Sequence, residues 1–138
     1  MPSVSLHNMD NLDVQLYLER ARMELRAIEV NIREELYAVA ISRCYYATFY
    51  AASGLLASIS IARSKHSGVI SAFREHFVKT GLIEVEFSDI LGVSFDARQE
   101  SDYELVPLVD RDLALKRLYD AQRFVDRIEN YLKSRGTS

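Results

Sequence analysis

Cysteine, glycine and proline are all scarce in this chain, and each scarcity excludes a class of protein. A single cysteine, Cys44, rules out an internal disulfide, and no cysteine and histidine cluster has the spacing of a zinc site. Five glycines and two prolines supply little of the turn chemistry that an all-β fold needs. A lone thiol is typical of a reducing compartment.

Long apolar runs are missing as well. No apolar stretch approaches the ~20 residues that cross a bilayer, and the N-terminus has no basic run followed by an apolar segment. We therefore expect a cytoplasmic protein without a membrane-spanning helix. With 49% hydrophobic and 27% charged residues, the chain is expected to form one domain over residues 1–138, with flexible ends at 1–9 and 135–138.

The charges are segregated along the chain, although the net charge of -3 does not indicate a general binder of polyanions. Residues 63–79 hold four lysines and arginines against one acidic side chain, Glu75. Residues 84–104 hold seven acidic side chains against one basic residue, Arg98. Two interpretations stay open, namely two solvated helix faces or a charged binding surface.

Apolar residues recur at three- and four-residue spacing through most of the chain, which predicts helices. The first helix is expected to begin at Asp10 or Asn11, because either residue is a good N-cap. The second, over about 34–60, is apolar around nearly its whole circumference. Such a helix is expected to be buried on most of its sides.

The third and fourth helices are marked by their end signals. Ser64 or Ser67 is expected to cap the third helix, and Gly81 is expected to end it. Gly92 interrupts the apolar pattern of the fourth helix, which predicts a bend or two shorter pieces. The segment DYELVP that follows is interpreted as a loop.

The last helix is expected over 111–134, with Asp110 as its N-cap. Five helical segments with short connections predict an all-α fold. We expect an antiparallel up-and-down bundle of four long helices and a short or broken one.

Arg43 lies in the middle of the second helix and shares a face with Tyr46 and Tyr50, three and seven residues further on. Because apolar positions surround it, we expect a buried guanidinium that meets an acidic partner. The arginine has two interpretations. It either forms a salt bridge or a stack on Tyr46 that fixes the helices, or it contacts a phosphate or RNA.

Several aromatic and polar residues join Arg43 as candidates for a ligand site. The tyrosines near Arg43, together with Phe49, are either core packing or a platform for base stacking. His66 is near a helix N-terminus, where capping or a surface hydrogen bond is expected. If the fourth helix packs beside the second, its polar residues gather near Arg43. The predicted ligand site comprises Arg43, Tyr46, His66, Arg98, Asp102 and Tyr103, and no catalytic residue, metal ligand or cofactor is predicted.

Three blocks of the sequence, SRCYYATFYAASGLL, KHSGVISAFREHFVKTG and RQESDY, follow one another between residues 36 and 104. In this order the chain resembles the small stand-alone prokaryotic proteins of the HEPN-domain family. The resemblance implies an antiparallel helical bundle that forms a homodimer and is often encoded beside a minimal nucleotidyltransferase in toxin–antitoxin-like pairs. In many members it also implies an RNase, whose motif is an arginine, four to six further residues and a histidine.

Arg98 matches the arginine of that motif, but Asp102 and Tyr103 follow it and no histidine does. An aspartate of ordinary pKa is a poor proton donor at neutral pH, whereas histidine acts there as acid or base. We therefore predict a non-catalytic or weakly catalytic HEPN protein that binds a nucleotidyltransferase partner, a nucleotide or RNA. The alternatives are a metal-independent RNase toxin, in which Asp102 or His66 replaces the histidine, and a structural dimeric adaptor.

Overall fold

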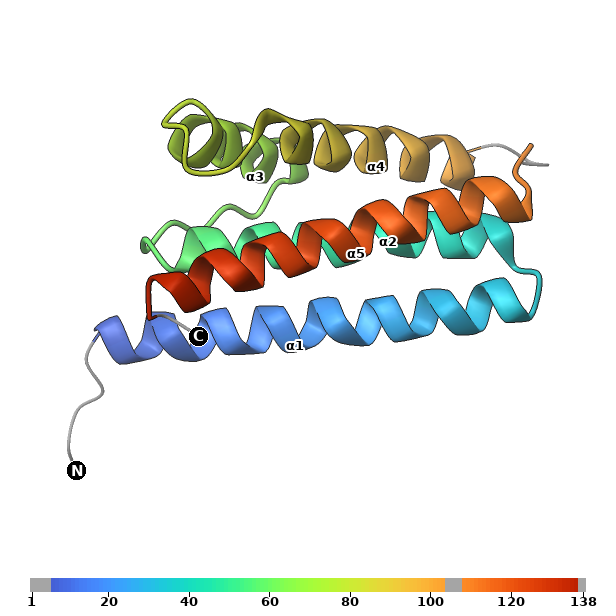
Figure 1. Cartoon of the computed structure of the whole chain (residues 1–138). Coiled ribbons are helices and arrows are strands. Elements are labelled where there is room, and N and C mark those ends of the chain that lie inside the picture. The colour runs from blue at the N-terminus through green and yellow to red at the C-terminus, as the bar shows by residue number, and fades with distance from the viewer. Residues whose placement is uncertain (1–5, 104–107, 137–138) are drawn as a thin grey trace.

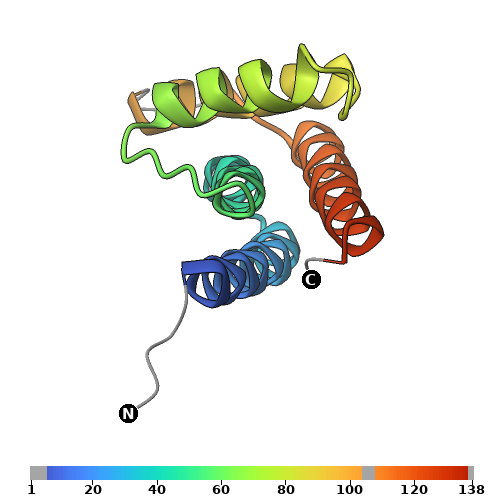
Figure 2. The same ribbon diagram turned by 90° about the vertical axis from the view of Figure 1, so that its left-hand side faces the viewer.

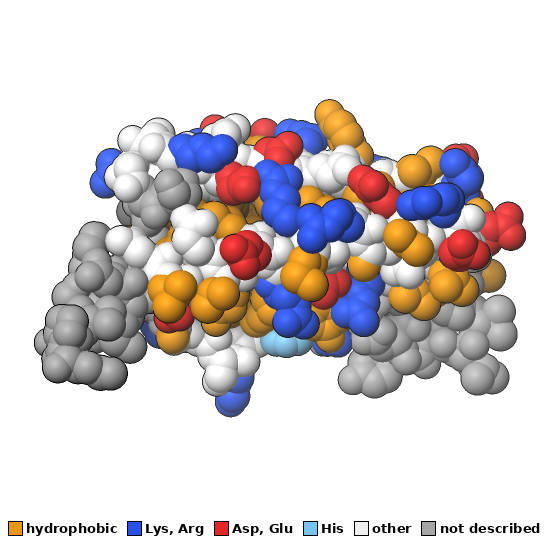
Figure 3. All heavy atoms as spheres, turned by 90° about the horizontal axis from the view of Figure 1, so that it is seen from below, with side chains coloured by type: hydrophobic (Ala, Val, Ile, Leu, Met, Phe, Trp, Pro, Cys, Tyr) orange, Lys and Arg blue, Asp and Glu red, His pale blue; other side chains and the backbone are white. Residues whose placement is uncertain are grey.

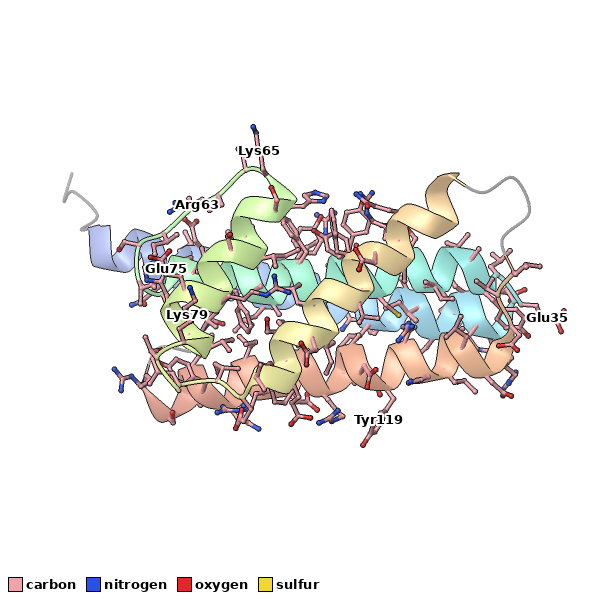
Figure 4. The ribbon with its side chains drawn as sticks, turned by 90° about the horizontal axis from the view of Figure 1, so that it is seen from above. Glu35, Arg63, Lys65, Glu75, Lys79 and Tyr119 are labelled. Carbon is pink, nitrogen blue, oxygen red and sulfur yellow. The ribbon has the colours of Figure 1, made fainter. Side chains whose placement is uncertain are left out.

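Helix α2 (Tyr37–Ala57) is the central element of an antiparallel helical bundle (Figure 2). The computed structural model describes residues 6–103 and 108–136, and the side chains of residues 11–99 and 108–136. The other elements are α1 (Leu6–Arg33), α3 (His66–Phe73) with its π-helical continuation η1 (Arg74–Val78), α4 (Val85–Tyr103) and α5 (Arg111–Ser134). Helices α1, α2 and α5 run alongside one another (Figure 1), and α3 and α4 form a layer that crosses them obliquely (Figure 4). The predicted all-α bundle is confirmed.

Small side chains allow α1 and α2 to approach closely. Ala40, Ala47 and Ala51 are fully buried in α2. At Gly54 a Cβ atom would lie 3.0 Å from the Cβ of Tyr17 on α1, so that glycine is required by the close approach. Alanine and glycine at three- and four-residue spacing form the groove in which the neighbouring helix packs. As predicted, α2 is buried on most of its sides.

One side of α2 nevertheless remains uncovered by the described helices. Viewed along its axis, α2 has α1 below it, α5 on one side and the layer of α3 and α4 above it (Figure 2). On the remaining side Arg43 is exposed, and Tyr46, Phe49 and Tyr50 are only half-buried. This open side of α2 carries Arg43 and Tyr46, two residues of the predicted ligand site.

The boundaries of the first two helices differ from the prediction. Helix α1 begins at Leu6 rather than at Asp10 or Asn11, so residues 6–9 of the expected flexible arm are helical and residues 1–5 lie outside the described part. Helix α2 is shorter than the expected 34–60. Its late start follows from Glu35, whose φ of 62° separates α1 from α2.

Both ends of the third helix can be compared with the prediction. Helix α3 begins at His66 with Lys65 in the N-cap position, so the expected caps Ser64 and Ser67 were wrong. Gly81 has a φ of 79° and follows the end of η1, as expected for a C-terminal glycine.

Helix α4 runs through Gly92 as one α-helix, so the two shorter pieces that were one expectation for this segment were wrong. Arg74 explains why a glycine occurs there without breaking the helix. Its Nε atom donates to Ser88 Oγ at 2.7 Å, and a Cβ on Gly92 would lie 3.1 Å from its Nη2 atom. The arginine therefore crosses the surface of α4 at the position that lacks a side chain.

The predicted end of α4 was wrong, whereas the predicted bounds of α5 are confirmed. Asp102 and Tyr103 belong to α4 rather than to a loop, while residues 104–107 lie outside the described part. Helix α5 has the predicted bounds and the predicted N-cap, because Leu113 N donates to Asp110 Oδ1 at 2.9 Å. The expected tail 135–138 begins directly after α5, and residues 137–138 are not described.

Candidate functional site: an aromatic–arginine cluster

Six residues from three helices form an aromatic–arginine cluster at the edge of the open side of α2. The cluster consists of Tyr45, Tyr46 and Phe49 from α2, His66 from α3, and Phe95 and Arg98 from α4. Tyr45 is its centre and is fully buried. The Tyr45 ring centroid lies 5.2 Å from that of His66 and 5.5 Å from that of Phe95. The packing of α3 and α4 on α2 brings these residues together.

Arg98 covers the rings of the cluster. Its Cζ atom lies 5.4 Å from the ring centroid of Tyr45, 5.8 Å from that of Tyr46 and 6.0 Å from that of Phe95. Its Nη1 atom donates a long hydrogen bond of 3.4 Å to the Tyr46 hydroxyl. These distances are typical of cation–π contacts, which hold a guanidinium at an aromatic face without neutralising its charge.

Arg43 lies on the other side of Tyr46, with its Cζ atom 5.9 Å from that ring centroid. Sequence analysis expected a buried guanidinium, but the Arg43 side chain is 48% exposed because α2 is open on this side. The expected acidic partner is present, since Arg43 Nη1 lies 3.4 Å from Glu24 Oε1 on α1. This partner comes from α1.

Glu24 is a buried carboxylate that joins two arginines. Besides its contact with Arg43, its Oε1 atom lies 4.0 Å from Arg20 Nε, one helical turn earlier on α1. The Cζ atom of Arg20 in turn lies 5.1 Å from the ring centroid of Tyr50. The spacing of Arg20 and Glu24 was visible in the sequence, but their approach to α2 was not. Sequence reasoning missed both residues, and it missed Phe95 for the same reason.

His66 packs among the rings and is not a simple cap. Its ring centroid lies 4.8 Å from that of Phe49, and no side-chain hydrogen bond caps α3. Burial lowers the pKa of His66 below its ordinary value, and the positive charge of Arg98 lowers it further. A neutral imidazole next to an arginine accepts a proton in acid–base chemistry more readily than it donates one.

Two of the predicted site residues cannot be placed in the cluster. The backbone of Asp102 and Tyr103 forms the last turn of α4, but their side chains lie outside the described part of the chain. The structure thus brings together Arg43, Tyr46, His66 and Arg98. In residues 11–99 and 108–136, no group of three or more histidine, cysteine or acidic side chains is arranged to hold a metal ion.

Two side chains of the acidic segment 84–104 are exposed and pair with arginines of α5. Glu84 and Glu86 pair with Arg127 and Arg123 of α5, each at 2.9 Å. The hydrogen bond from Arg127 lowers the pKa of Glu84. In the basic segment, Arg74 packs across α4, whereas Lys65 extends outward at the edge opposite Tyr119 (Figure 4).

Comparison with known proteins places the chain among sequences of similar length. The HEPN domain model matches residues 14–131. A protein of Methanocaldococcus jannaschii named "Putative toxin MJ0605" is 35% identical over 88% of this chain and 90% of its own length. A "UPF0332 protein" of Thermotoga maritima is 34% identical over 87% of this chain and 91% of its own length.

A solved structure supports the same fold. The crystal structure of the protein TT1696 from Thermus thermophilus superposes with a TM-score of 0.73 at 19% sequence identity. The match covers 86% of this chain and 98% of that one. Within the described residues, none of the helices has the length and apolar character needed to cross a bilayer.

Proposed function

Because the chain belongs to the HEPN family, we propose that it is the HEPN member of a toxin–antitoxin-like pair and binds a nucleotide or RNA at the aromatic–arginine cluster. The observation that carries the proposal is the position of Arg98 over Tyr45, Tyr46 and Phe95 on a side of α2 that no described helix covers. Aromatic rings stack with bases, and a guanidinium contacts phosphate through paired donors. The proposed protein is a homodimer that binds RNA without efficient cleavage.

The absence of a histidine after Arg98 supports binding over cleavage. The residues from 99 to 110 contain no histidine, and the aspartate at 102 does not supply the same acid–base chemistry at neutral pH. Arg43 is already paired with Glu24. We assign the phosphate contact to Arg98 because its guanidinium lies over the rings of Tyr45, Tyr46 and Phe95, and we assign to Arg43 the role of holding α1 against α2.

Fluorescence anisotropy with a labelled single-stranded RNA tests the proposal, with ATP as competitor to distinguish a nucleotide site from an RNA site. Arg98→Ala is expected to weaken RNA binding by roughly 10- to 100-fold, since base stacking and phosphate contacts are each worth about 1–3 kcal/mol. Arg123→Ala is the matched control, because Arg123 also covers two rings, those of Phe87 and Tyr119, on the α4–α5 side. Equal loss of binding in both variants would contradict the assignment.

A second candidate function, a metal-independent RNase, is favoured by one observation. His66 packs against Tyr45 and Phe95, the rings that Arg98 covers, although it lies 32 positions earlier in the sequence. A histidine remote in sequence therefore lies in the neighbourhood of the motif arginine. The lowered pKa of His66 keeps its imidazole neutral at pH 7, which is the form that accepts a proton from an RNA 2′-hydroxyl.

Incubation with RNA in buffer free of divalent cations distinguishes the two functions. The binding proposal predicts no cleavage above the background of the Arg98→Ala variant. Robust cleavage that both Arg98→Ala and His66→Gln abolish would establish the RNase instead. Circular dichroism of each variant is the control for folding.

The proposed partner is a minimal nucleotidyltransferase encoded beside this chain. Its support is the family membership and the naming of relatives as toxins. Co-expression of an adjacent nucleotidyltransferase gene with this chain is expected to give a complex that survives affinity purification and relieves any growth arrest. A neighbouring gene of another kind, or a nucleotidyltransferase that does not co-purify, would contradict this partner.

A further inference from the structure

A groove between α1 and α2 adjoins the aromatic–arginine cluster on the open side of α2. The groove has a volume of about 440 Å³, and its walls come from one face of α1 and from Tyr50 of α2. A view of the molecule from below shows hydrophobic side chains next to Lys and Arg side chains and a histidine along the lower edge (Figure 3). A concave site of this size is in the range of ligand pockets. The groove is therefore a candidate for a second binding site beside the cluster.

A row of tyrosine rings connects the cluster with the groove. The ring centroids of Tyr45 and Tyr46 are 5.4 Å apart, and those of Tyr46 and Tyr50 are 6.3 Å apart. Tyr17 of α1 extends the row, because its ring centroid lies 6.5 Å from that of Tyr50 at an interplanar angle of 27°. Tyr46, Tyr50 and Tyr17 are half-buried, so part of each side chain reaches the surface. Successive bases of a single-stranded nucleic acid stack on aromatic side chains arranged in this way.

Arginines accompany the rings along this row. At the end far from Arg98, the Cζ atom of Arg20 lies 5.1 Å from the ring centroid of Tyr50, and the Arg20 side chain is 55% exposed. Arg43 lies over Tyr46 between these two ends. A guanidinium contacts phosphate through paired donors while bases stack on the neighbouring rings. The row therefore offers positive charge at both of its ends.

The buried carboxylate of Glu24 determines which arginine of the groove is available for a phosphate. It lies between Arg20 and Arg43, so the three groups together carry one net positive charge. The Glu24 carboxylate is 3.4 Å from Arg43 and 4.0 Å from Arg20. Because the attraction between charges falls with distance, Arg20 is the less compensated of the two. Glu24 thus leaves a positive charge at the edge of the groove.

The other side chains of the groove match a ribonucleotide. Asp13 and Glu19 line it, and both are exposed. Carboxylates repel phosphates, but they accept hydrogen bonds from hydroxyl groups such as the 2′-hydroxyl of a ribose. Leu16 and Met23 add apolar surface against which a base or sugar packs. An acidic peptide would meet the same carboxylates without a hydroxyl or a base to offer, so the lining favours RNA.

We propose that the groove is a second subsite for single-stranded RNA, in which Arg20 contacts a phosphate and Tyr50 stacks with a base. One strand then runs from Arg98 across α2 to α1. The inference rests on the proposed binding of RNA at the aromatic–arginine cluster and extends it to another helix. A stacked strand rises about 3.4 Å per nucleotide, so several nucleotides are needed to span the ring-to-ring steps between the subsites. The chain is therefore expected to prefer RNA strands to free nucleotides.

Fluorescence anisotropy with labelled uridine strands of two and eight nucleotides tests the second subsite in the full-length chain. The wild type is expected to bind the longer strand roughly 10-fold or more tightly than the dinucleotide, because the longer strand reaches both subsites. Arg20→Ala is expected to abolish this gain and to leave dinucleotide binding within about 2-fold of the wild type. It is also expected to reduce the salt dependence of log K for the longer strand by about 0.7, the slope of one phosphate contact. Arg98→Ala is expected to weaken binding of both strands.

Two further variants separate the subsite from general effects of charge and folding. Arg26→Ala is the matched control, because Arg26 is an exposed arginine of α1 that does not line this groove. Tyr50→Leu removes the ring but keeps an apolar side chain, and it is expected to lose the same gain as Arg20→Ala. Circular dichroism of each variant is the control for folding.

The nature of the occupant is tested with two competitors of the longer strand. A DNA strand of the same length lacks the 2′-hydroxyl and is expected to bind roughly 5-fold more weakly than RNA. A glutamate peptide is expected not to displace the RNA. Equal affinity for DNA would overturn the ribose contact of Asp13 and Glu19, and displacement by the peptide would overturn RNA as the occupant.

The strand-length series distinguishes failure of this inference from failure of the proposed function. Equal affinity of the wild type for both strands would overturn the second subsite and leave binding at the aromatic–arginine cluster intact. A wild type that binds neither strand overturns both proposals. A loss in Arg20→Ala that is equal for both strands, or that Arg26→Ala reproduces, would overturn the assignment of Arg20.

Discussion

Two arginine-covered aromatic surfaces lie on different sides of the bundle, and they differ in how the arginine is held. On the α4–α5 side, the Cζ atom of Arg123 lies 5.5 Å from the ring centroid of Phe87 and 5.7 Å from that of Tyr119. The Nη2 atom of Arg123 also donates to Glu86 Oε2 at 2.9 Å. A charge-assisted hydrogen bond of this length uses the arginine to join α4 and α5.

In the aromatic–arginine cluster the rings are more deeply packed and the arginine is held differently. Tyr45 is fully buried, whereas Tyr119 on the other surface is 60% exposed. Arg98 reaches a hydroxyl at 3.4 Å, that of Tyr46. An arginine over aromatic rings is therefore not by itself a ligand site. The depth at which the rings are packed distinguishes the two surfaces.

Replacing one tyrosine ring of each surface is expected to give the largest difference in the free energy of unfolding. Tyr45→Ala removes a fully buried side chain and is expected to lower the free energy of unfolding by about 3–5 kcal/mol. Tyr119→Ala is expected to change it by no more than about 0.5 kcal/mol. Urea denaturation measures both changes, and equal losses would remove the distinction between the surfaces.

Tyr45→Phe is the matched control for that experiment. The Tyr45 hydroxyl is buried, and it has no hydrogen-bond partner among the described residues. Removing it keeps the ring and is expected to leave stability unchanged or raise it by up to about 1 kcal/mol. A large loss would show that the hydroxyl is hydrogen-bonded.

A smaller difference in the free energy of unfolding is expected when the carboxylate near each surface loses its charge. Glu24→Gln is expected to lower the free energy of unfolding by about 1–2 kcal/mol, because the Glu24 side chain is only 8% exposed and meets both Arg20 and Arg43. Glu86→Gln is expected to have a smaller effect, since that side chain is 55% exposed. Thermal unfolding at low and high salt measures the difference. A larger loss of stability for Glu86→Gln than for Glu24→Gln would contradict this prediction.

The smallest expected effect is on the pH dependence of stability. The pKa of His66 is lowered in the folded state, so the unfolded chain takes up a proton more readily below the ordinary value of 6.5. The stability that neutral His66 contributes is present above pH 6.5 and is lost as the pH falls. His66→Gln is therefore expected to show a shallower decline in stability between about pH 6.5 and 5 than the wild type. Identical slopes would show that His66 is not buried among the rings.

The residues that were predicted correctly are those whose signals are local. Asp110 caps α5 through its own third neighbour, and Gly81 ends its helix with a positive φ, so a few adjacent residues define each boundary. The burial of α2 follows in the same way from the composition of one helix. The HEPN resemblance likewise rested on three contiguous blocks.

The main errors at the site concern contacts between segments far apart in the sequence. Gly92 was expected to bend α4 or to divide it into two pieces, but α4 runs through it as one helix, and Arg74 packs across the glycine. Arg43 was expected to be buried, because an apolar circumference does not show which side of a helix its neighbours leave open. Among the site residues, Glu24 and Phe95 were missed for the same reason.

Periodicity, end signals and motifs are properties of the chain, and they were enough to establish the helices, the central place of α2, the family and an Arg98 without a following histidine. The packing of the helices was needed to show that Arg98 lies over Tyr45 beside His66, that Glu24 meets Arg43, and that α1 and α2 form a groove on the open side. Each of these arrangements depends on how whole helices cross. That geometry is set by side-chain packing summed over the bundle, which no short stretch of sequence encodes.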